Sequence, residues 1–334
     1  MMKMKAIRIH SYGGPEVMQL EELPMPVPGP GRALVRVQAA SVNFLDVQHR
    51  RGDLVNQAFY KKEGAVEYKL PATIGSQCVG IVESLGPGDS PVQVGDRVIC
   101  GGGSGTYATH VIAPVQRLIP VPDELRLEHA AAGLTQGFLA YALTHAAYPV
   151  KPGDWCLIHA AAGGIGLLLC QMAKLRGGKV IGVTSSEDKA HSVREAGAGE
   201  VIISTQADIA KEARRITGGR GVNVVYDGVG RDTFEASLDS LAPRGYLEIF
   251  GQASGFIPPF DLMLLQEKGS LYINRFSGLY FMKEWHSYLP KFLDWIREGR
   301  LSVKVGRTYS LADAVKAHIA FEQRQVTGRV LLIP

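Results

Sequence analysis

The chain has 334 residues, of which 46% are apolar and 20% charged, a composition typical of a globular protein with room for two domains. Its 36 basic and 32 acidic residues leave a net charge of +4 with no block of like charge, which argues against a nucleic-acid or membrane partner. Neither a signal-peptide pattern nor an 18-residue apolar run occurs, and we expect a soluble, cytoplasmic protein.

Short β-rich segments, separated by Gly and Pro, occupy the chain through about residue 120. The predicted strands cover residues 33–40, 80–86, 96–100 and 107–112. This half of the chain therefore reads as a compact, antiparallel, barrel-like domain.

From about residue 124 the apolar pattern alternates between helix and strand. The predicted helices are 127–147, 164–176, 187–196, 207–216 and 231–240, and the predicted strands are 154–158, 178–183, 200–203, 222–226 and 245–250. This alternation predicts a parallel, doubly wound α/β sheet. Beyond Gly251 we expect a strand at 270–274, a helix at 284–298 and a second helix with Ser310 as its N-cap. We predict a first domain over 1–124, a second over 125–266, and a return of 267–334 to the first domain, with a cleft between the two bodies.

A glycine-rich turn joins the predicted strand 154–158 to the helix that follows it. The run His159-Ala160-Ala161-Ala162-Gly163-Gly164-Ile165-Gly166 has Gly163 and Gly166 at the second and third positions of a dinucleotide fingerprint, with Ala161 at the first. The second glycine allows close approach to a pyrophosphate, and the third lets the helix pack on the strand. We predict that Gly163, Gly164, Ile165 and Gly166 bind the cofactor pyrophosphate; the alternative is a turn without a ligand.

The next strand ends in hydroxyl side chains where an NAD enzyme would carry an acid. Thr184 and Ser185 stand about 20 residues after the loop, and Lys189 follows one helical turn later. Hydroxyls and a cation favour the 2′-phosphate of NADPH, provided that Glu187 and Asp188 point outward. The alternative for Lys189 is a solvated helix residue.

Candidate metal ligands are few. The nine histidines include no i, i+4 pair, and His159 near Cys156 reads as a packed histidine beside the loop. The four cysteines lack C-x-x-C spacing and lie among apolar residues, so we predict buried free thiols at Cys78, Cys100, Cys156 and Cys170. We therefore predict no metal site, and a metal-free site suits a conjugated acceptor that needs little polarisation.

Motifs spread over essentially the whole chain resemble the zinc-independent quinone oxidoreductases of the medium-chain dehydrogenase/reductase superfamily. These motifs are Ser41-Val42-Asn43-Phe44-Leu45-Asp46, Val94-Gly95-Asp96-Arg97-Val98, the glycine loop, Ile216-Thr217-Gly218-Gly219, Val225-Tyr226-Asp227-Gly228-Val229-Gly230, Phe250-Gly251 and Lys268-Gly269-Ser270-Leu271. Zinc-dependent relatives carry G-H-E and a ligand cysteine, where this chain has Gly75-Ser76-Gln77 and Asn43.

The resemblance implies a GroES-like domain, a Rossmann domain, NADPH as reductant and a homodimer joined near Ser270 to Asn274. It assigns Asn43 to the nicotinamide and substrate end, Ser185 and Lys189 to the adenosine phosphate, and Phe250 and Gly251 to the nicotinamide pocket. Asp46 is also a family position, although a helix-capping role explains it equally well.

Three features depart from the family pattern. Ser204 replaces a tyrosine beside the adenosine phosphate, and Gln48 replaces a tyrosine beside the quinone. The stretch 56–69 is longer than the usual loop, and reads either as a lid near the cleft mouth or as a surface excursion.

The resulting hypothesis is hydride transfer from NADPH to a quinone without a metal. Asn43 would donate a hydrogen bond to the acceptor oxygen, unless it is only a turn residue, and the proton would come from water. The candidate catalytic residues are Asn43, Asp46 and Gln48. One alternative is reduction of an enone or enoyl thioester by the same chemistry, and another is a crystallin-like nucleotide-binding protein without turnover.

Overall fold

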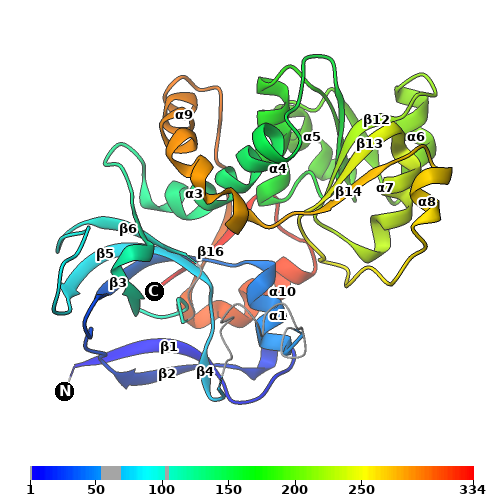
Figure 1. The fold of residues 1–334 in the computed structure, drawn as a ribbon. Coiled ribbons are helices and arrows are strands. Elements are labelled where there is room, and N and C mark those ends of the chain that lie inside the picture. The colour runs from blue at the N-terminus through cyan, green and yellow to red at the C-terminus, as the bar shows by residue number, and fades with distance from the viewer. Residues whose placement is uncertain (1, 54–68, 102–104) are drawn as a thin grey trace. The chain divides into compact units, whose positions relative to one another are not determined.

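The computed structural model describes residues 2–53, 69–101 and 105–334, and the chain forms two compact units (Figure 1). Unit 1 comprises Met1–Thr135 and Lys304–Pro334, and unit 2 comprises Gln136–Val303. The segment 267–303 thus belongs to unit 2, whereas the sequence analysis returned it to the first domain. The reason is strand pairing, because β14 (Tyr272–Arg275) extends the sheet of unit 2 beside β13 (Leu241–Ile249).

Unit 1 is built from two sheets around one apolar core. A three-stranded sheet has the order β2-β1-β4, and a seven-stranded sheet has the order β15-β16-β3-β5-β6-β8, with β7 paired to β3. The bounds are β1 Lys3–Ile9, β2 Met18–Pro24, β3 Arg32–Ser41, β4 Ala72–Thr73, β5 Gln77–Leu85, β6 Arg97–Gly101, β7 His110–Pro114, β8 Leu118–Pro120, β15 Val305–Ser310 and β16 Arg329–Ile333. The predicted strands correspond to β3, β5, β6 and β7, and the mostly antiparallel pairing agrees with the predicted barrel-like domain.

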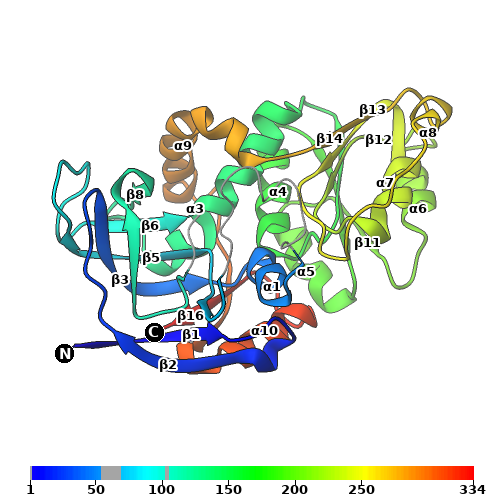
Figure 2. The same cartoon turned by 60° about the horizontal axis from the view of Figure 1, so that its bottom comes forward.

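Two helices of unit 1 lie against each other although they come from opposite ends of the chain. Helix α1 (Phe44–Arg51) begins after Asn43 and ends at Gly52, whose φ of 79° is the left-handed conformation that favours glycine. Helix α10 (Ala314–Glu322) follows a 3-10 turn that starts after Ser310. Both views show α1 beside α10 (Figures 1 and 2), and ion pairs from Arg50 and Arg51 to Glu322 join them.

Unit 2 is a doubly wound sheet of six parallel strands, as the sequence predicts. The strand order is β11-β10-β9-β12-β13-β14, which reverses direction between β9 and β12. The remaining strand bounds are β9 Trp155–Ile158, β10 Lys179–Thr184, β11 Glu200–Ile203 and β12 Val222–Asp227. Loops that follow β9 and β12 therefore meet at the switch point, where doubly wound sheets bind their ligands.

Helices cover both faces of this sheet, with α4 and α5 on one face and α6 and α7 on the other (Figure 1). Their bounds are α4 Gly164–Leu175, α5 Glu187–Glu195, α6 Ile209–Ile216, α7 Phe234–Ser240, α8 Met263–Glu267 and α9 Trp285–Arg297. Asp208 explains the start of α6, because its carboxylate accepts the Lys211 amide at 3.0 Å. Helix α3 (Leu127–Ala142) continues as a π-helical turn over Leu143–Ala147, so the predicted helix 127–147 is helical throughout.

The cysteines agree with their predicted state, since Cys78, Cys100, Cys156 and Cys170 are all buried free thiols. Among the described residues, no helix combines the length and apolar character that a membrane crossing requires.

Candidate functional site

The glycine loop connects β9 to α4 at the switch point of the sheet. Ala160 takes a left-handed backbone with φ of 49°, and the Gly163 amide donates to its carbonyl at 2.9 Å. The Ala161 amide donates to the Val183 carbonyl at 2.9 Å, which ties the loop to β10. Gly163 is the N-cap of α4 and has no side chain to cap it, so the first amide groups of the helix stay open to an anion.

Gly166 sits where the helix meets the loop most closely. A Cβ at this position would lie 2.4 Å from the Ala160 oxygen and 2.7 Å from the Ala161 Cα, and both atoms belong to the backbone. Only glycine allows this contact, which is the packing role of the third fingerprint position. At Gly163 a Cβ would meet only the Ala160 oxygen, at 3.2 Å.

Hydroxyl and ammonium groups gather at the end of β10. Lys189 is half-buried and its Nζ donates to Ser185 Oγ at 3.3 Å, while the Ser204 hydroxyl donates to the Thr184 carbonyl at 3.2 Å. Glu187 and Asp188 are exposed on the first turn of α5. The two acids therefore point outward, as a 2′-phosphate site requires. The hydroxyls and the Lys189 ammonium fit an anion better than the 2′-hydroxyl of NAD.

Asp227 organises the other side of the switch point, and the sequence analysis did not single it out as a site residue. Its Oδ1 accepts the amides of Val229 at 2.7 Å and Gly230 at 3.0 Å, and its Oδ2 accepts the hydroxyls of Thr233 at 2.7 Å and Ser237 at 2.9 Å. The carboxylate thus holds the turn that follows β12. The Val225–Gly230 motif was the available signal for it.

His159 contacts this carboxylate through Ser237. Because the Ser237 proton goes to Asp227, the His159 Nε2–H donates to Ser237 Oγ at 3.0 Å. Burial lowers the pKa of His159, although Asp227 opposes that shift. A serine between the histidine and the acid is the wrong order for a nucleophile, so His159 is a packed histidine, as predicted.

Phe250 and Gly251 lie directly against this turn. Their amides donate to the Asp227 carbonyl at 2.9 and 3.3 Å. A Cβ on Gly228 would lie 2.7 Å from the Phe250 ring, and one on Gly251 would lie 2.5 Å from the Gly228 oxygen. The loops after β12 and β13 therefore pack against each other, while the role of Phe250 and Gly251 toward nicotinamide stays a prediction.

Asn43 is the N-cap of α1 and lies within unit 1. Its backbone amide donates to Asp46 Oδ2 at 2.8 Å, which is the backbone half of a capping box. Its Nδ2 donates to Ser76 Oγ at 3.2 Å and to the Ser41 carbonyl at 3.4 Å, and Arg329 Nη2 donates to its Oδ1 at 2.7 Å. Ser76 and Asn43 occupy the two positions that the resemblance equates with zinc ligands, and their side chains are in contact here. The sequence analysis did not identify Arg329.

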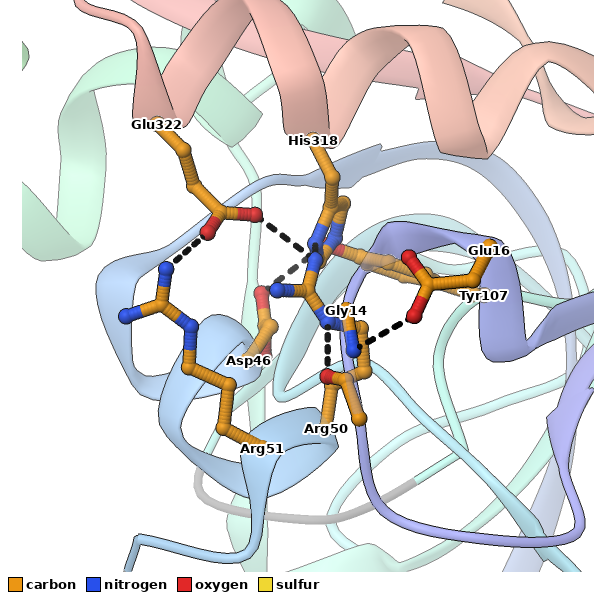
Figure 3. A network of polar contacts seen from close by, with 9 residues as sticks. Gly14, Glu16, Asp46, Arg50, Arg51, Tyr107, His318 and Glu322 are labelled. Atoms are coloured by element: carbon orange, nitrogen blue, oxygen red, sulfur yellow. Dashed lines mark hydrogen bonds and ion pairs between the residues drawn. The ribbon is translucent and has the colours of Figure 1, made fainter.

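Asp46 is fully buried and accepts the Tyr107 hydroxyl at 3.0 Å (Figure 3). Burial raises its pKa to about 6, although Ser76, the Asn43 amide, Tyr107 and Arg329 all act in the opposite direction. Because this value lies above that of the unfolded chain, ionising Asp46 costs stability as the pH rises from about 4 through 6. Its hydrogen bonds to the Asn43 amide and to Tyr107 show that Asp46 caps α1 and fixes the Tyr107 hydroxyl.

A chain of donors leads to Tyr107 from helix α10 (Figure 3). His318 Nε2 lies 3.0 Å from the Tyr107 oxygen, and Arg50 Nη1 lies 2.9 Å from His318 Nδ1 and 2.7 Å from Glu322 Oε1. Arginine only donates, so Nδ1 accepts and Nε2–H donates to Tyr107, whose own proton goes to Asp46. Burial, with Arg50 and Arg51, lowers the pKa of His318 to about 3. The chain ends at a guanidinium, which does not release its proton, so it is no proton path.

Gln48, the third candidate catalytic residue, is buried in α1, and its carbonyl accepts the amides of Gly52 and Asp53. Most of the long stretch 56–69 lies outside the described residues. Within residues 2–53, 69–101 and 105–334, no three His, Cys, Asp or Glu side chains gather closely enough to hold a metal ion.

Two family models match the chain. The alcohol dehydrogenase GroES-like domain matches residues 29–123, and the model described as zinc-binding dehydrogenase matches residues 164–297. A quinone oxidoreductase of Pseudomonas aeruginosa is 37% identical over 99% of both chains. The chain belongs to the quinone oxidoreductase family. This family lies in the medium-chain dehydrogenase/reductase superfamily, as the motifs indicated, and the GroES-like and Rossmann architecture is confirmed with it.

Other relatives are similar to the chain to the same degree. A 2-haloacrylate reductase of Burkholderia sp is 38% identical over 98% of both chains. Among solved structures, the Escherichia coli quinone oxidoreductase complexed with NADPH has a TM-score of 0.91 at 36% identity, over 99% of this chain and 100% of that one.

The contact at Gly166 makes a testable prediction. In Gly166→Ala, the new methyl group must push α4 away from the loop, and we expect a loss of about 1–3 kcal/mol in the free energy of unfolding, measured by urea denaturation. The control is Gly199→Ala, because Gly199 is exposed and a Cβ there meets nothing within 4 Å. A Gly166→Ala variant as stable as the parent would contradict the packing argument.

Proposed function

We propose that this chain is an NADPH-dependent quinone reductase that works without a metal ion. The observation that carries the proposal is the cluster of Lys189, Ser185 and Ser204 at the end of β10. Two further observations support it: α4 begins at a glycine without a side-chain cap, and the chain belongs to the quinone oxidoreductase family. A solved relative of this family is a complex with NADPH.

Unit 2 supplies the residues for the dinucleotide. The open amides after Gly163, in the run Gly164, Ile165 and Gly166, would hold the pyrophosphate. Lys189 and Ser185 would hold the 2′-phosphate, with Thr184 and Ser204 shaping the end of that site, and Phe250 and Gly251 would flank the nicotinamide. Bound NADPH supplies a hydride from its nicotinamide ring.

Unit 1 supplies the polar groups for the acceptor. Asn43 Nδ2 makes two long hydrogen bonds to neutral oxygens, at 3.2 and 3.4 Å. A developing oxyanion accepts roughly twice as strongly as a neutral oxygen, so Asn43 Nδ2 would exchange one of these long bonds for a bond to the oxyanion. The chain from Arg50 to Asp46 delivers no proton, and solvent would protonate the product. Asp46 and Gln48 would then act on the position of α1 and Asn43.

A second candidate substrate class is supported by the 2-haloacrylate reductase relative. A 2-haloacrylate is a conjugated carboxylic acid, and its reduction uses the same hydride transfer to an activated double bond. An enone or enoyl thioester could therefore replace the quinone.

A homodimer is proposed through strand β14. This strand is the edge of the six-stranded sheet, and Tyr272 on it is 45% exposed. Further exposed apolar side chains lie in the segment just before it, at Phe256, Phe260, Leu262 and Met263. Pairing of two such edges would satisfy the backbone groups that one edge leaves open.

The acceptor class is tested by following NADPH oxidation at 340 nm with 1,4-benzoquinone, with methyl vinyl ketone and with 2-chloroacrylate. We expect the quinone to give the highest kcat/KM. Turnover of the enone or the chloroacrylate alone would assign the second class. Tight NADPH binding without turnover of any acceptor would identify a nucleotide-binding protein instead.

The phosphate contact is tested by Lys189→Ala. Loss of a charged hydrogen bond of about 1.5–3 kcal/mol should raise the KM for NADPH at least tenfold and change the KM for NADH less than twofold. Lys211→Ala is the control, since the Lys211 side chain is 87% exposed on α6. Equal changes for NADPH and NADH would refute the contact.

A further inference from the structure

We infer that Arg329 is a positioning residue, which fixes the Asn43 side-chain amide with its nitrogen toward Ser76. Arg329 is the first residue of β16, the last strand of the chain, and it lies 286 residues beyond Asn43 in the sequence. The effect on the reaction rests on the proposed function, whereas the orientation of the amide is a property of unit 1 alone.

The orientation follows from the hydrogen-bonding inventory of the two side chains. A guanidinium carries donors only, so the Asn43 atom that lies 2.7 Å from Arg329 Nη2 must be the oxygen. The nitrogen then faces Ser76 Oγ and the Ser41 carbonyl, both of which can accept. Without Arg329, the amide would keep only its two long bonds, to Ser76 Oγ and to the Ser41 carbonyl, and the direction of the Asn43 donors would be held less firmly.

The burial of Arg329 is unfavourable, which argues for a specific role. Its side chain is buried, and that burial lowers its pKa to about 10 even though Asp46 and Tyr107 favour the charged form. Its Nε has no hydrogen-bond partner. A well-packed apolar side chain would commonly be at least as stable in such a place as a buried charge. The short bond to Asn43 is the interaction that a hydrophobic replacement would lose.

Asp46 binds the backbone of Asn43, whereas Arg329 binds its side chain. Asp46 Oδ2 accepts the Asn43 backbone amide at 2.8 Å. Its negative charge also favours the charged form of Arg329 more than Tyr107 does. Tyr107 and His318 in turn hold Asp46. Backbone and side chain of Asn43 are thereby fixed by separate partners. Arg329 makes the shortest hydrogen bond to the side-chain amide, and the Ser41 carbonyl at 3.4 Å favours the same orientation.

The test is a double-mutant cycle with Arg329→Met, Asn43→Ala and the double variant. Misplacing one group in a reacting site commonly costs up to about a hundredfold in rate, and we expect Arg329→Met to lower kcat for the preferred acceptor about tenfold with the NADPH KM unchanged. In the Asn43→Ala background, Arg329→Met should change kcat less than twofold, because its target is already missing. An equal loss in both backgrounds, or no loss in either, would overturn the proposal.

Two further variants separate positioning from folding. Arg329→Lys keeps the charge and a donor, and it should recover at least a third of the parent kcat. Arg97→Met is the control, because the Arg97 guanidinium donates to backbone carbonyls of Pro122, Asp123 and Leu125 in the same unit. It should lower Tm without lowering kcat. If Arg329→Met does not fold, Arg329→Gln replaces it, and an unreduced kcat in Arg329→Gln with a parent-like NADPH KM would overturn the proposal.

An NMR readout decides the orientation without any turnover. The side-chain amide signals of Asn43, assigned by their loss in Asn43→Ala, should shift in Arg329→Met and stay in place in Arg97→Met. Unchanged signals in folded Arg329→Met would overturn the inference. If none of the acceptors tested supports NADPH oxidation by the parent protein, the proposed function fails. The NMR measurement still decides the role of Arg329 in that case.

Discussion

A carboxylate without access to water is the constraint on which unit 1 depends. Asp46 is fully buried, and a buried negative charge is tolerated only where donors surround it. Its donors and counter-charge come from the cap of α1, from Tyr107 before β7 and from Arg329 on β16. Asp46 Oδ2 accepts the bonds from Asn43 and Tyr107, whereas Oδ1 is buried without a hydrogen-bond partner among the described residues. The surroundings of one carboxylate thus bring together segments from the beginning, the middle and the end of the chain.

The same requirement orders the side chains that contact these donors. Tyr107 can donate to Asp46 because it accepts from His318, and His318 can donate because its other nitrogen accepts from Arg50. Every proton in the chain points toward the carboxylate, which is the direction that favours its ionised form. Since Glu322 then neutralises Arg50, α1 and α10 are joined by charge as well as by packing. In unit 2, close backbone contact at Gly166 has the corresponding role, since it sets where α4 begins.

The sequence predicted unit 2 more completely than unit 1, for a physical reason. A parallel sheet has local periodicity and local turn signals, so its strands and the helices from 164 to 240 followed from patterns of a few residues, although their order in the sheet did not. The placement of 267–303 did not, because it depends on β14 pairing with β13. Arg329 and Tyr107 carry no local signal, since their role comes from contacts across hundreds of residues. Asn43 and Asp46 were found only through the family motif that contains them. The sequence predicted a phosphate contact at Lys189 provided that Glu187 and Asp188 point outward, and only the structure shows that both are exposed.

The central claim is that Asp46 is buried and ionisable, that it accepts the Tyr107 hydroxyl, and that the charge of Arg329 favours its ionised form. The most direct measurement is a ¹³C NMR titration of its side-chain carboxyl in the full chain, assigned by comparison with Asp46→Asn. The account predicts a midpoint near pH 6 in the parent protein, where burial outweighs the donors, and a higher midpoint in Arg329→Met, where one favourable charge is removed. A midpoint near 4, unchanged in Arg329→Met, would show a solvated carboxylate and contradict the account.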